Sequence, residues 1–314
     1  MTPSPMRPGR DCPLSYRYPP ASLRREAEIV SDAIYVVGGL YGNVEALDRV
    51  RSMAADEPGA ALVFNGDFHW FDVSREDFLA VNGAVLAHHA LRGNVETEIA
   101  ADDSGAGCGC AYPMDVSDAE VARSNRIIER LRDAARAFPS LRKGLGELPM
   151  NLVAQVGGAR VGIVHGDASS LAGWGFAHDR LDDPRHRRWI EGAFRDARVD
   201  AFAGSHTCLP AMRAFEVEGR RRAVANNGAA GMPNFAATRH GLLTRISTRP
   251  FAGPGRAYGL ALGAVSIDAV AIEYDHGRWM ERFLASWPEG SAAHASYHRR
   301  MVEGPRHAPA AAAP

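Results

Sequence analysis

The chain has 314 residues, of which 46% are hydrophobic and 23% are charged, and its formal net charge is −1. This length allows one large α/β domain or two smaller ones, and the composition is that of an ordinary globular protein. The balance of 36 Lys and Arg residues against 37 Asp and Glu residues gives no electrostatic reason to expect nucleic acid or a membrane surface as a partner.

The first half of the chain alternates between short apolar runs and helical patterns. Residues 1–30 are rich in Pro and Arg and predict an N-terminal arm that is partly disordered. The main domain, residues 31–290, then begins with a buried strand (IYVVGG), a helix (NVEALDRVRSMAADE) and a second strand (ALVFNGD). A second helix (REDFLAVNGAVLAHHA) and a short strand that runs into a loop (ALRGNVE) follow. This alternation predicts an α/β architecture.

Residues 97–150 interrupt the alternation. They begin with a Gly/Asp-rich loop (ADDSGAGCGCAYPMD) and continue with a long helix (VSDAEVARSNRIIERLRDAARAF), for which Ser117 or Asp118 is the expected N-cap. We interpret this segment as a helical insertion that caps a cleft.

The second half of the chain is predicted to be rich in strands. Strands are expected at MNLVAQVGG, ARVGIVHGD, DAFAGSH, AMRAFEVEG, RRAVANNG, GLLTRIS and AVSIDAVAIEYD, with one helix near 185–197. Residues 291–314 form the predicted C-terminal tail, and its end (HAPAAAAP) has the low complexity of a disordered segment.

The termini and apolar runs favour a cytoplasmic protein. The N-terminus (MTPSPMRPGRDCPLSYRYPP) lacks the apolar core of a signal peptide. The longest apolar stretch (AYGLALGAVSIDAVAIEY) is interrupted by Ser266 and Asp268 and predicts two strands instead of a membrane span. In that compartment the four cysteines are expected to be thiols or ligands and not a disulfide framework.

Four candidate metal ligands each follow an apolar, strand-like run. They are Asp67 in FNGDFHWFD, Asn94 in LRGNVE, His165 in VGIVHGD and His206 in GSHTC. Side chains at strand ends project into a shared cleft at the edge of a sheet. The order and placement of these four residues therefore predict a metal site.

At this point the sequence resembles the calcineurin-like metallophosphoesterase family. The matching segments are GGLYGNVEAL, GDFHWFD, GNVE, HGD and SHTC, followed by NNGAAGMP, and together they cover residues 33–275. The resemblance implies a four-layer α-β-β-α sandwich of two mixed sheets flanked by helices. It also implies two divalent metal ions, bridged by the aspartate of the GD motif and by a hydroxide that attacks phosphorus.

The resemblance assigns a complete second metal site to this chain. Asp67 takes the bridging position, and Asn94, His165 and His206 are the other ligands. Asp67, Asn94 and His206 are the predicted catalytic residues. The expected cofactor is a divalent ion (Mn, Fe or Zn), one or two per chain, and the expected substrate is a small phosphorylated molecule.

The first metal site departs from the family pattern. Gly39 and Tyr41 stand where the family has an aspartate and a histidine, and Cys208 stands where its last motif ends in histidine. Neutral tyrosine and glycine do not replace those ligands, although a tyrosinate binds ferric iron and a thiolate binds Zn or Fe. Val95 replaces the histidine that assists the leaving group, and valine cannot move a proton.

These departures leave three functions open. The first is a working phosphoester hydrolase, because one metal ion can still activate water. The second is a degenerate binding or regulatory protein on the same fold. The third is non-phosphoester chemistry at a rebuilt site in which Cys208 is a metal ligand and selects a softer metal.

Several further residues are candidates for the same cleft. Tyr41 and Asn43 lie in and just after the altered first motif, and we predict both as substrate-binding residues. His69 is a third predicted substrate-binding residue and would add an imidazole to the site, although a structural role is commoner for such a histidine. Cys108 and Cys110 in CGC could form a reducible pair, supply thiolates to the site, or be ordinary loop cysteines. Trp174 either packs beside the HGD loop or stacks on a substrate base.

Overall fold

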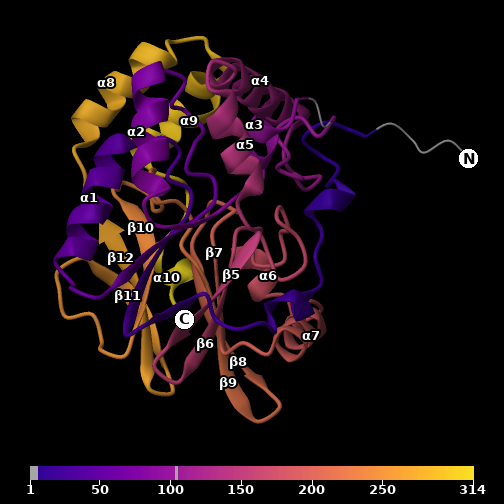
Figure 1. The fold of residues 1–314 in the computed structure, drawn as a ribbon, viewed down its shortest axis with the longest axis vertical. Coiled ribbons are helices and arrows are strands. Elements are labelled where there is room, and N and C mark those ends of the chain that lie inside the picture. Colours follow the sequence, from indigo (N-terminus) through magenta and orange to yellow (C-terminus); the bar gives the residue numbers. More distant parts are fainter. Residues whose placement is uncertain (1–5, 103–104) are drawn as a thin grey trace, which may run out of the picture.

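The computed structural model describes residues 6–102 and 105–314, and in these residues the strands form two six-stranded mixed sheets that face each other (Figure 1). The first sheet has the order β1-β5-β6-β7-β9-β8 and consists of β1 (Ile29–Ser31), β5 (Asn151–Val156), β6 (Ala159–Val164), β7 (Ala201–Gly204), β9 (Arg220–Asn226) and β8 (Ala211–Val217). The second has the order β11-β12-β10-β2-β3-β4 and consists of β11 (Arg256–Leu262), β12 (Val265–Ile272), β10 (Gly241–Ser247), β2 (Ala33–Val37), β3 (Ala61–Asn65) and β4 (His89–Leu91).

Each sheet combines a parallel part with antiparallel hairpins. In the second sheet β2, β3 and β4 are parallel because helices connect them, whereas β10, β11 and β12 are antiparallel. In the first sheet β6 is parallel to β7, and β7 to β9. The parallel strands β3, β4, β6 and β7 therefore bring their carboxyl ends to the same end of the sandwich.

Helices cover the outer faces of the two sheets (Figure 1). On the side of the second sheet lie α1 (Val44–Ala55), α2 (Arg75–Val85) and α8 (His276–Ser286). On the side of the first sheet lie α6 (His178–Leu181) and α7 (Arg187–Ala197), and α7 packs against the 3-10 helix η2 (Pro20–Leu23). A buried aliphatic core, which includes Ile34, Val36 and Val63 from one sheet and Val161 and Ile163 from the other, fills the space between the sheets.

The insertion forms a helical layer over the carboxyl ends of the strands. It contains α4 (Asp118–Ala135), capped by Ser117 as predicted, and α5 (Pro139–Glu147). These helices pack with each other and with α3 (Asn94–Ala100), and α4 also packs against α9 (Ala292–Glu303). Residues 103 and 104 of the predicted Gly/Asp-rich loop lie outside the described residues.

Two predicted elements differ from the structure. The second helix ends at Val85 and not near Ala90, because His89 already pairs with Val63 in the parallel sheet. The segment after β4 is not a loop: Asn94 is the first residue of α3 and Gly93 is its N-cap. The Glu96 side chain accepts from the Gly93 backbone N–H at 2.8 Å, as the glutamate of a capping box does.

The segments outside the predicted main domain are packed against it where the structure describes them. In the N-terminal arm, of which residues 1–5 lie outside the description, Tyr18 donates to the backbone oxygen of Asp167 at 2.6 Å. The low-complexity end carries α10 (Pro309–Ala312) instead of lacking structure, because Arg213 donates to the backbone oxygens of its last residues. The limits of arm, domain and tail remain predictions.

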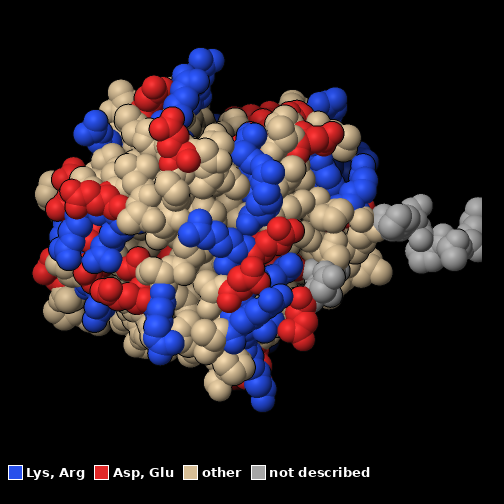
Figure 2. All heavy atoms as spheres, turned by 90° about the horizontal axis from the view of Figure 1, so that it is seen from above, with Lys and Arg blue, Asp and Glu red and all other residues tan. Residues whose placement is uncertain are grey.

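The surface has no dominant charge on the face seen in Figure 2. There the side chains of Lys and Arg alternate with those of Asp and Glu, as the near-zero net charge of the chain would suggest. None of the described helices combines the length and the apolar character needed to cross a bilayer.

Candidate metal centre

The four predicted ligands meet at the carboxyl ends of four parallel strands. Asp67 follows β3 and Asn94 follows β4 in one sheet, whereas His165 follows β6 and His206 follows β7 in the other. The Nε2 atom of His165 lies at the centre of the group. It is 3.1 Å from His206 Nδ1, 3.2 Å from Asn94 Oδ1 and 3.3 Å from Asp67 Oδ1.

Both imidazoles are oriented by backbone carbonyls on their far sides. His165 Nδ1 lies 2.9 Å from the Asn65 oxygen, and His206 Nε2 lies 3.0 Å from the Cys110 oxygen. A carbonyl only accepts hydrogen bonds, so in the neutral rings these nitrogens carry the protons. The lone pairs of His165 Nε2 and His206 Nδ1 therefore face each other, which is the arrangement that a metal-binding histidine pair requires.

Asn94 and Asp67 add two oxygen ligand atoms to the two imidazole nitrogens. Asn94 donates through Nδ2 to the backbone oxygen of Cys108 at 2.9 Å, so its Oδ1 is free to face His165. Asp67, His165 and His206 are all buried, and one ligand atom of each lies within 4.8 Å of the others. Two imidazole nitrogens, an amide oxygen and a carboxylate oxygen suit a divalent ion such as Zn, Fe or Mn.

The pKa values of the two histidines shift in opposite directions. Burial, and then the neighbouring His165, lower the pKa of His206 to about 3, so that ring is neutral. Burial opposes charge on His165 as well, but the adjacent Asp67 outweighs it and raises the pKa of His165 above its ordinary value. The centre of the group thus attracts either a proton or a metal ion.

A buried glutamate that the sequence analysis missed holds the loop of Asp67. Glu96 Oε2 accepts from the backbone N–H groups of Asp67 and Gly93, both at 2.8 Å, and Oε1 accepts from Phe68 at 3.0 Å and His69 at 3.2 Å. This carboxylate connects the loop after β3 to the start of α3 and stabilises the left-handed backbone of Asp67, whose φ is 50°. The signal was present in GNVE, where a glutamate follows an N-cap by three positions.

At the position of the altered first motif, where the family pattern has a first metal ion, the side chains of Tyr41 and Cys208 contact each other. The Tyr41 hydroxyl lies 2.9 Å from Cys208 Sγ. A Cβ at Gly39, whose φ is 65°, would lie 2.8 Å from the Tyr41 ring, so the tyrosine takes the space of any side chain at position 39. Burial, together with Cys208 and Asp67, raises the pKa of Tyr41 well above its ordinary value, which keeps it neutral.

Gly39, Tyr41 and Cys208 do not fit a metal ion at this first position. Glycine has no ligand atom, and a neutral tyrosine hydrogen-bonded to a thiol is a poor ligand. Among the described residues, Cys208 is not part of the group of Asp67, His165 and His206. The predicted role of Cys208 as a ligand therefore gains no support from the ligand distances.

Two further candidates, Asn43 and His69, lie away from the cluster. Asn43 caps α1 by accepting from Ala46 N at 3.0 Å and donates to the Gly231 oxygen at 2.9 Å, so both ends of its amide are used. The fully buried His69 lies 2.6 Å from Asp72 Oδ2 and stacks on Phe78 with ring centroids 4.4 Å apart. Neither residue lines the pocket that opens above the cluster and is described below.

The two CGC cysteines have different positions. Cys108 and Cys110 are both buried free thiols, and only Cys110 lines the pocket. Burial, and then Cys108, raise the pKa of the Cys110 thiol well above its ordinary value. The backbone of Cys110 has the clearer role, because its oxygen accepts hydrogen bonds from His206 Nε2 and from Trp174 Nε1, both at 3.0 Å.

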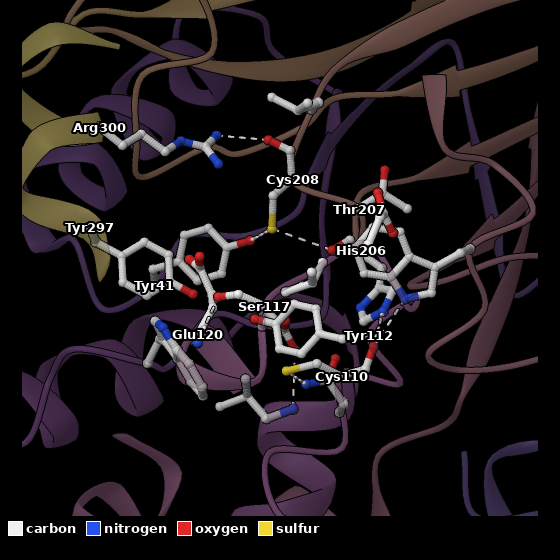
Figure 3. A pocket seen from close by; sticks show the side chains of 18 residues that line it. Tyr41, Cys110, Tyr112, Ser117, Glu120, His206, Thr207, Cys208, Tyr297 and Arg300 are labelled. Carbon is white, nitrogen blue, oxygen red and sulfur yellow. Dashed lines mark hydrogen bonds between the residues drawn. The ribbon is translucent and has the colours of Figure 1, made fainter. Parts of the chain in front are cut away.

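A pocket of about 560 Å³ opens above the cluster (Figure 3). Its floor includes Asp67, Asn94 and His206. The insertion forms one wall, and α9, which the sequence analysis placed in the tail, contributes Tyr297 and Arg300. The pocket also has an aromatic lining composed of Tyr41, Trp70, Tyr112, Trp174 and Tyr297.

Comparison with known proteins identifies the fold. No protein-family profile matches the chain, and no curated protein matches its sequence. A hypothetical protein from Pyrococcus horikoshii OT3 superposes with a TM-score of 0.59 and 16% identity, over 89% of this chain and 100% of that one. A metallophosphoesterase from Sphaerobacter thermophilus superposes with a TM-score of 0.52 and 15% identity, over 88% of this chain and 100% of that one.

The chain has a calcineurin-like metallophosphoesterase fold. The four-layer sandwich of two mixed sheets flanked by helices, expected from the sequence motifs, is confirmed. Within this metallophosphoesterase fold, the buried Asp67, His165 and His206 form a group that can hold a metal ion.

Proposed function

We propose that the protein is a metal-dependent hydrolase of small phosphoesters that works with one divalent ion. The observation that carries the proposal is the convergence of two lone-pair imidazole nitrogens with the side-chain oxygens of Asp67 and Asn94 below an open pocket. A divalent ion bound there would lower the pKa of a water molecule and neutralise charge on the phosphoryl group.

The protein's own residues would fix the geometry of that reaction. The Asn65 and Cys110 carbonyls hold the two histidines in one tautomer and orientation. Glu96 holds the loop of Asp67. Because Asp67, Asn94 and His206 line the pocket from below, a phosphoryl group in the pocket would lie against the ion.

The pocket favours a small substrate. Its volume of about 560 Å³ is in the range of small-molecule sites. Tyr112 and Trp174 lie on the wall next to His206, with a centroid distance of 5.4 Å between the Trp174 and His206 rings. Trp174 is fixed by its hydrogen bond to Cys110, so it could stack on an aromatic leaving group without first being ordered.

The test is metal analysis combined with turnover. Protein purified without added metal is analysed for bound Mn, Fe and Zn, and phosphomonoesters and phosphodiesters are then assayed with each ion. We expect about one ion per chain, and we expect Asp67→Asn to remove both metal and turnover. The matched control is Asp133→Asn, at an exposed position of α4. Turnover that persists in Asp67→Asn would exclude this site as its source.

The alternative is a protein that binds a ligand without turnover. It is favoured by the closed Tyr41–Cys208 pair and by the apolar Val95 that lines the pocket where a proton donor is expected. One bound metal with no hydrolysis of any tested phosphoester would support this alternative.

A further inference from the structure

We propose that Arg300 binds the phosphoryl group of the substrate, in the part of the pocket where the fold would otherwise hold a first metal ion. This inference rests on the phosphoester hydrolysis proposed above. It assigns a role to a residue of α9, a helix that none of the sequence motifs includes.

The guanidinium group of Arg300 is fixed by two neutral acceptors. Nε donates to the Pro233 oxygen at 3.1 Å, and Nη2 donates to the Cys208 oxygen at 2.7 Å. In the part of the chain that the structure describes, Arg300 has no ion pair with a carboxylate within 4.0 Å. Its position is therefore set while its charge is left without a counterion.

Arg300 lies beside the altered first site, next to Cys208. The backbone oxygen that it contacts belongs to Cys208, whose Sγ lies 2.9 Å from the Tyr41 hydroxyl. Figure 3 shows Arg300 and Tyr41 next to Cys208 on one side of the pocket, with His206 beyond Cys208. The neutral Tyr41–Cys208 pair thus has a cation beside it, on the side of the pocket that would otherwise be next to a metal ion.

An anion is the ligand that this arrangement suits. A half-buried guanidinium without a counterion has lost hydration and gains most from a charged acceptor. Among the acids that line the same pocket, Glu120 lies 3.8 Å from Arg123. Phosphate offers several acceptor oxygens, and the arginine fork binds such groups with a defined geometry. One metal ion and Arg300 would then contact the phosphoryl group from two sides.

Phosphate binding tests the inference directly. Inorganic phosphate is titrated calorimetrically into metal-loaded wild type, Arg300→Met, Arg300→Lys and Arg299→Met. The control, Arg299, is the preceding residue of α9, is 73% exposed and pairs with Glu303 at 2.8 Å. We expect Arg300→Met to weaken phosphate binding roughly tenfold or more, and Arg300→Lys to weaken it less. Arg299→Met should bind like wild type.

A second measurement uses only the wild type, so it remains informative if Arg300→Met fails to fold. Phenylglyoxal modification of arginines is followed by peptide mass spectrometry with and without inorganic phosphate. We expect phosphate to slow modification of Arg300 and not of Arg299. Equal modification of Arg300 in both conditions, or a folded Arg300→Met with unchanged phosphate affinity, would overturn the inference.

The two proposals fail in different ways. If phosphate binding requires Arg300 but no phosphoester is hydrolysed, hydrolysis is wrong and the anion site remains. If Asp67-dependent turnover is present and Arg300→Met keeps wild-type phosphate affinity and KM, hydrolysis stands and the role of Arg300 is wrong.

Discussion

Two neighbouring parts of the pocket differ in their chemistry. We call the part with Asp67, Asn94, His165 and His206 the metal side, and the part with Tyr41 and Cys208 the closed side. On one side, His165, His206, Asn94 and Asp67 direct nitrogen and oxygen ligand atoms at a common point. On the other, Tyr41 and Cys208 satisfy each other at 2.9 Å. The first arrangement suits a cation, whereas the second needs none. The same fold can therefore hold a metal ion at Asp67, His165 and His206, while neutral side chains fill the neighbouring position.

The contrast extends to the backbone. On the metal side, Glu96 accepts four backbone N–H groups and fixes a strained loop. On the closed side, the left-handed backbone at Gly39 and Tyr41 is accommodated by packing the tyrosine ring against a residue without Cβ. The Tyr41 ring therefore occupies the space that a side chain at position 39 would need.

The largest effect is expected on the metal side. Glu96→Gln replaces one of the two acceptor oxygens with an NH₂ group that faces backbone donors, so we expect a loss of about 2–4 kcal/mol in the free energy of unfolding. Metal affinity should fall about tenfold or more, because the loop of Asp67 is no longer held. Denaturant unfolding and metal titration measure both effects. The exposed Glu129→Gln on α4 is the control, and equal behaviour of the two variants would contradict the role of Glu96.

Restoring the family's aspartate by itself should damage the closed side. Gly39→Asp places Cβ 2.8 Å from the Tyr41 ring and puts a side chain at a φ of 65°, with an expected cost of about 1–3 kcal/mol. Adding Tyr41→His should recover part of that stability, since the clash is removed. A double-mutant cycle of unfolding free energies measures this coupling. Additive effects of the two substitutions would show that the changes are independent.

Val95, which follows Asn94 in α3, is expected to determine which leaving groups are tolerated. Val95 cannot donate a proton, so aryl phosphates with acidic leaving groups should react faster than alkyl phosphates. Val95→His should raise kcat for alkyl phosphates by roughly tenfold, with little change for aryl phosphates. The dependence of log kcat on leaving-group pKa, compared between wild type and variant, is the measurement. An unchanged slope would indicate that another group already donates the proton.

The smallest effect is expected from the hydrogen bond within the closed pair. Tyr41→Phe keeps the ring and removes the contact with Cys208 Sγ, so unfolding free energy should fall by about 1 kcal/mol or less. Bound metal, measured by elemental analysis, should not change. Loss of metal in Tyr41→Phe would show that the two halves are one site and would break the comparison.

Much of the fold was predictable because its signals are local. Apolar runs of strand length, separated by helical patterns, gave the order of strands and helices around Asp67 and His165 correctly. Ser117 was recognised as an N-cap from its position before a periodic segment. The helical start at Asn94 was missed because the glutamate signal in GNVE was not used.

The sequence by itself determined that four ligand-type residues end four strands, because strand ends and turns are encoded by neighbouring residues. Only the tertiary structure decided how those ligands are oriented and what surrounds them. The Cys110 carbonyl that orients His206 is 96 residues away from it, and Arg300 is 92 residues from Cys208. Such contacts depend on how α9 and the insertion pack over the sheets, and no local pattern encodes that packing.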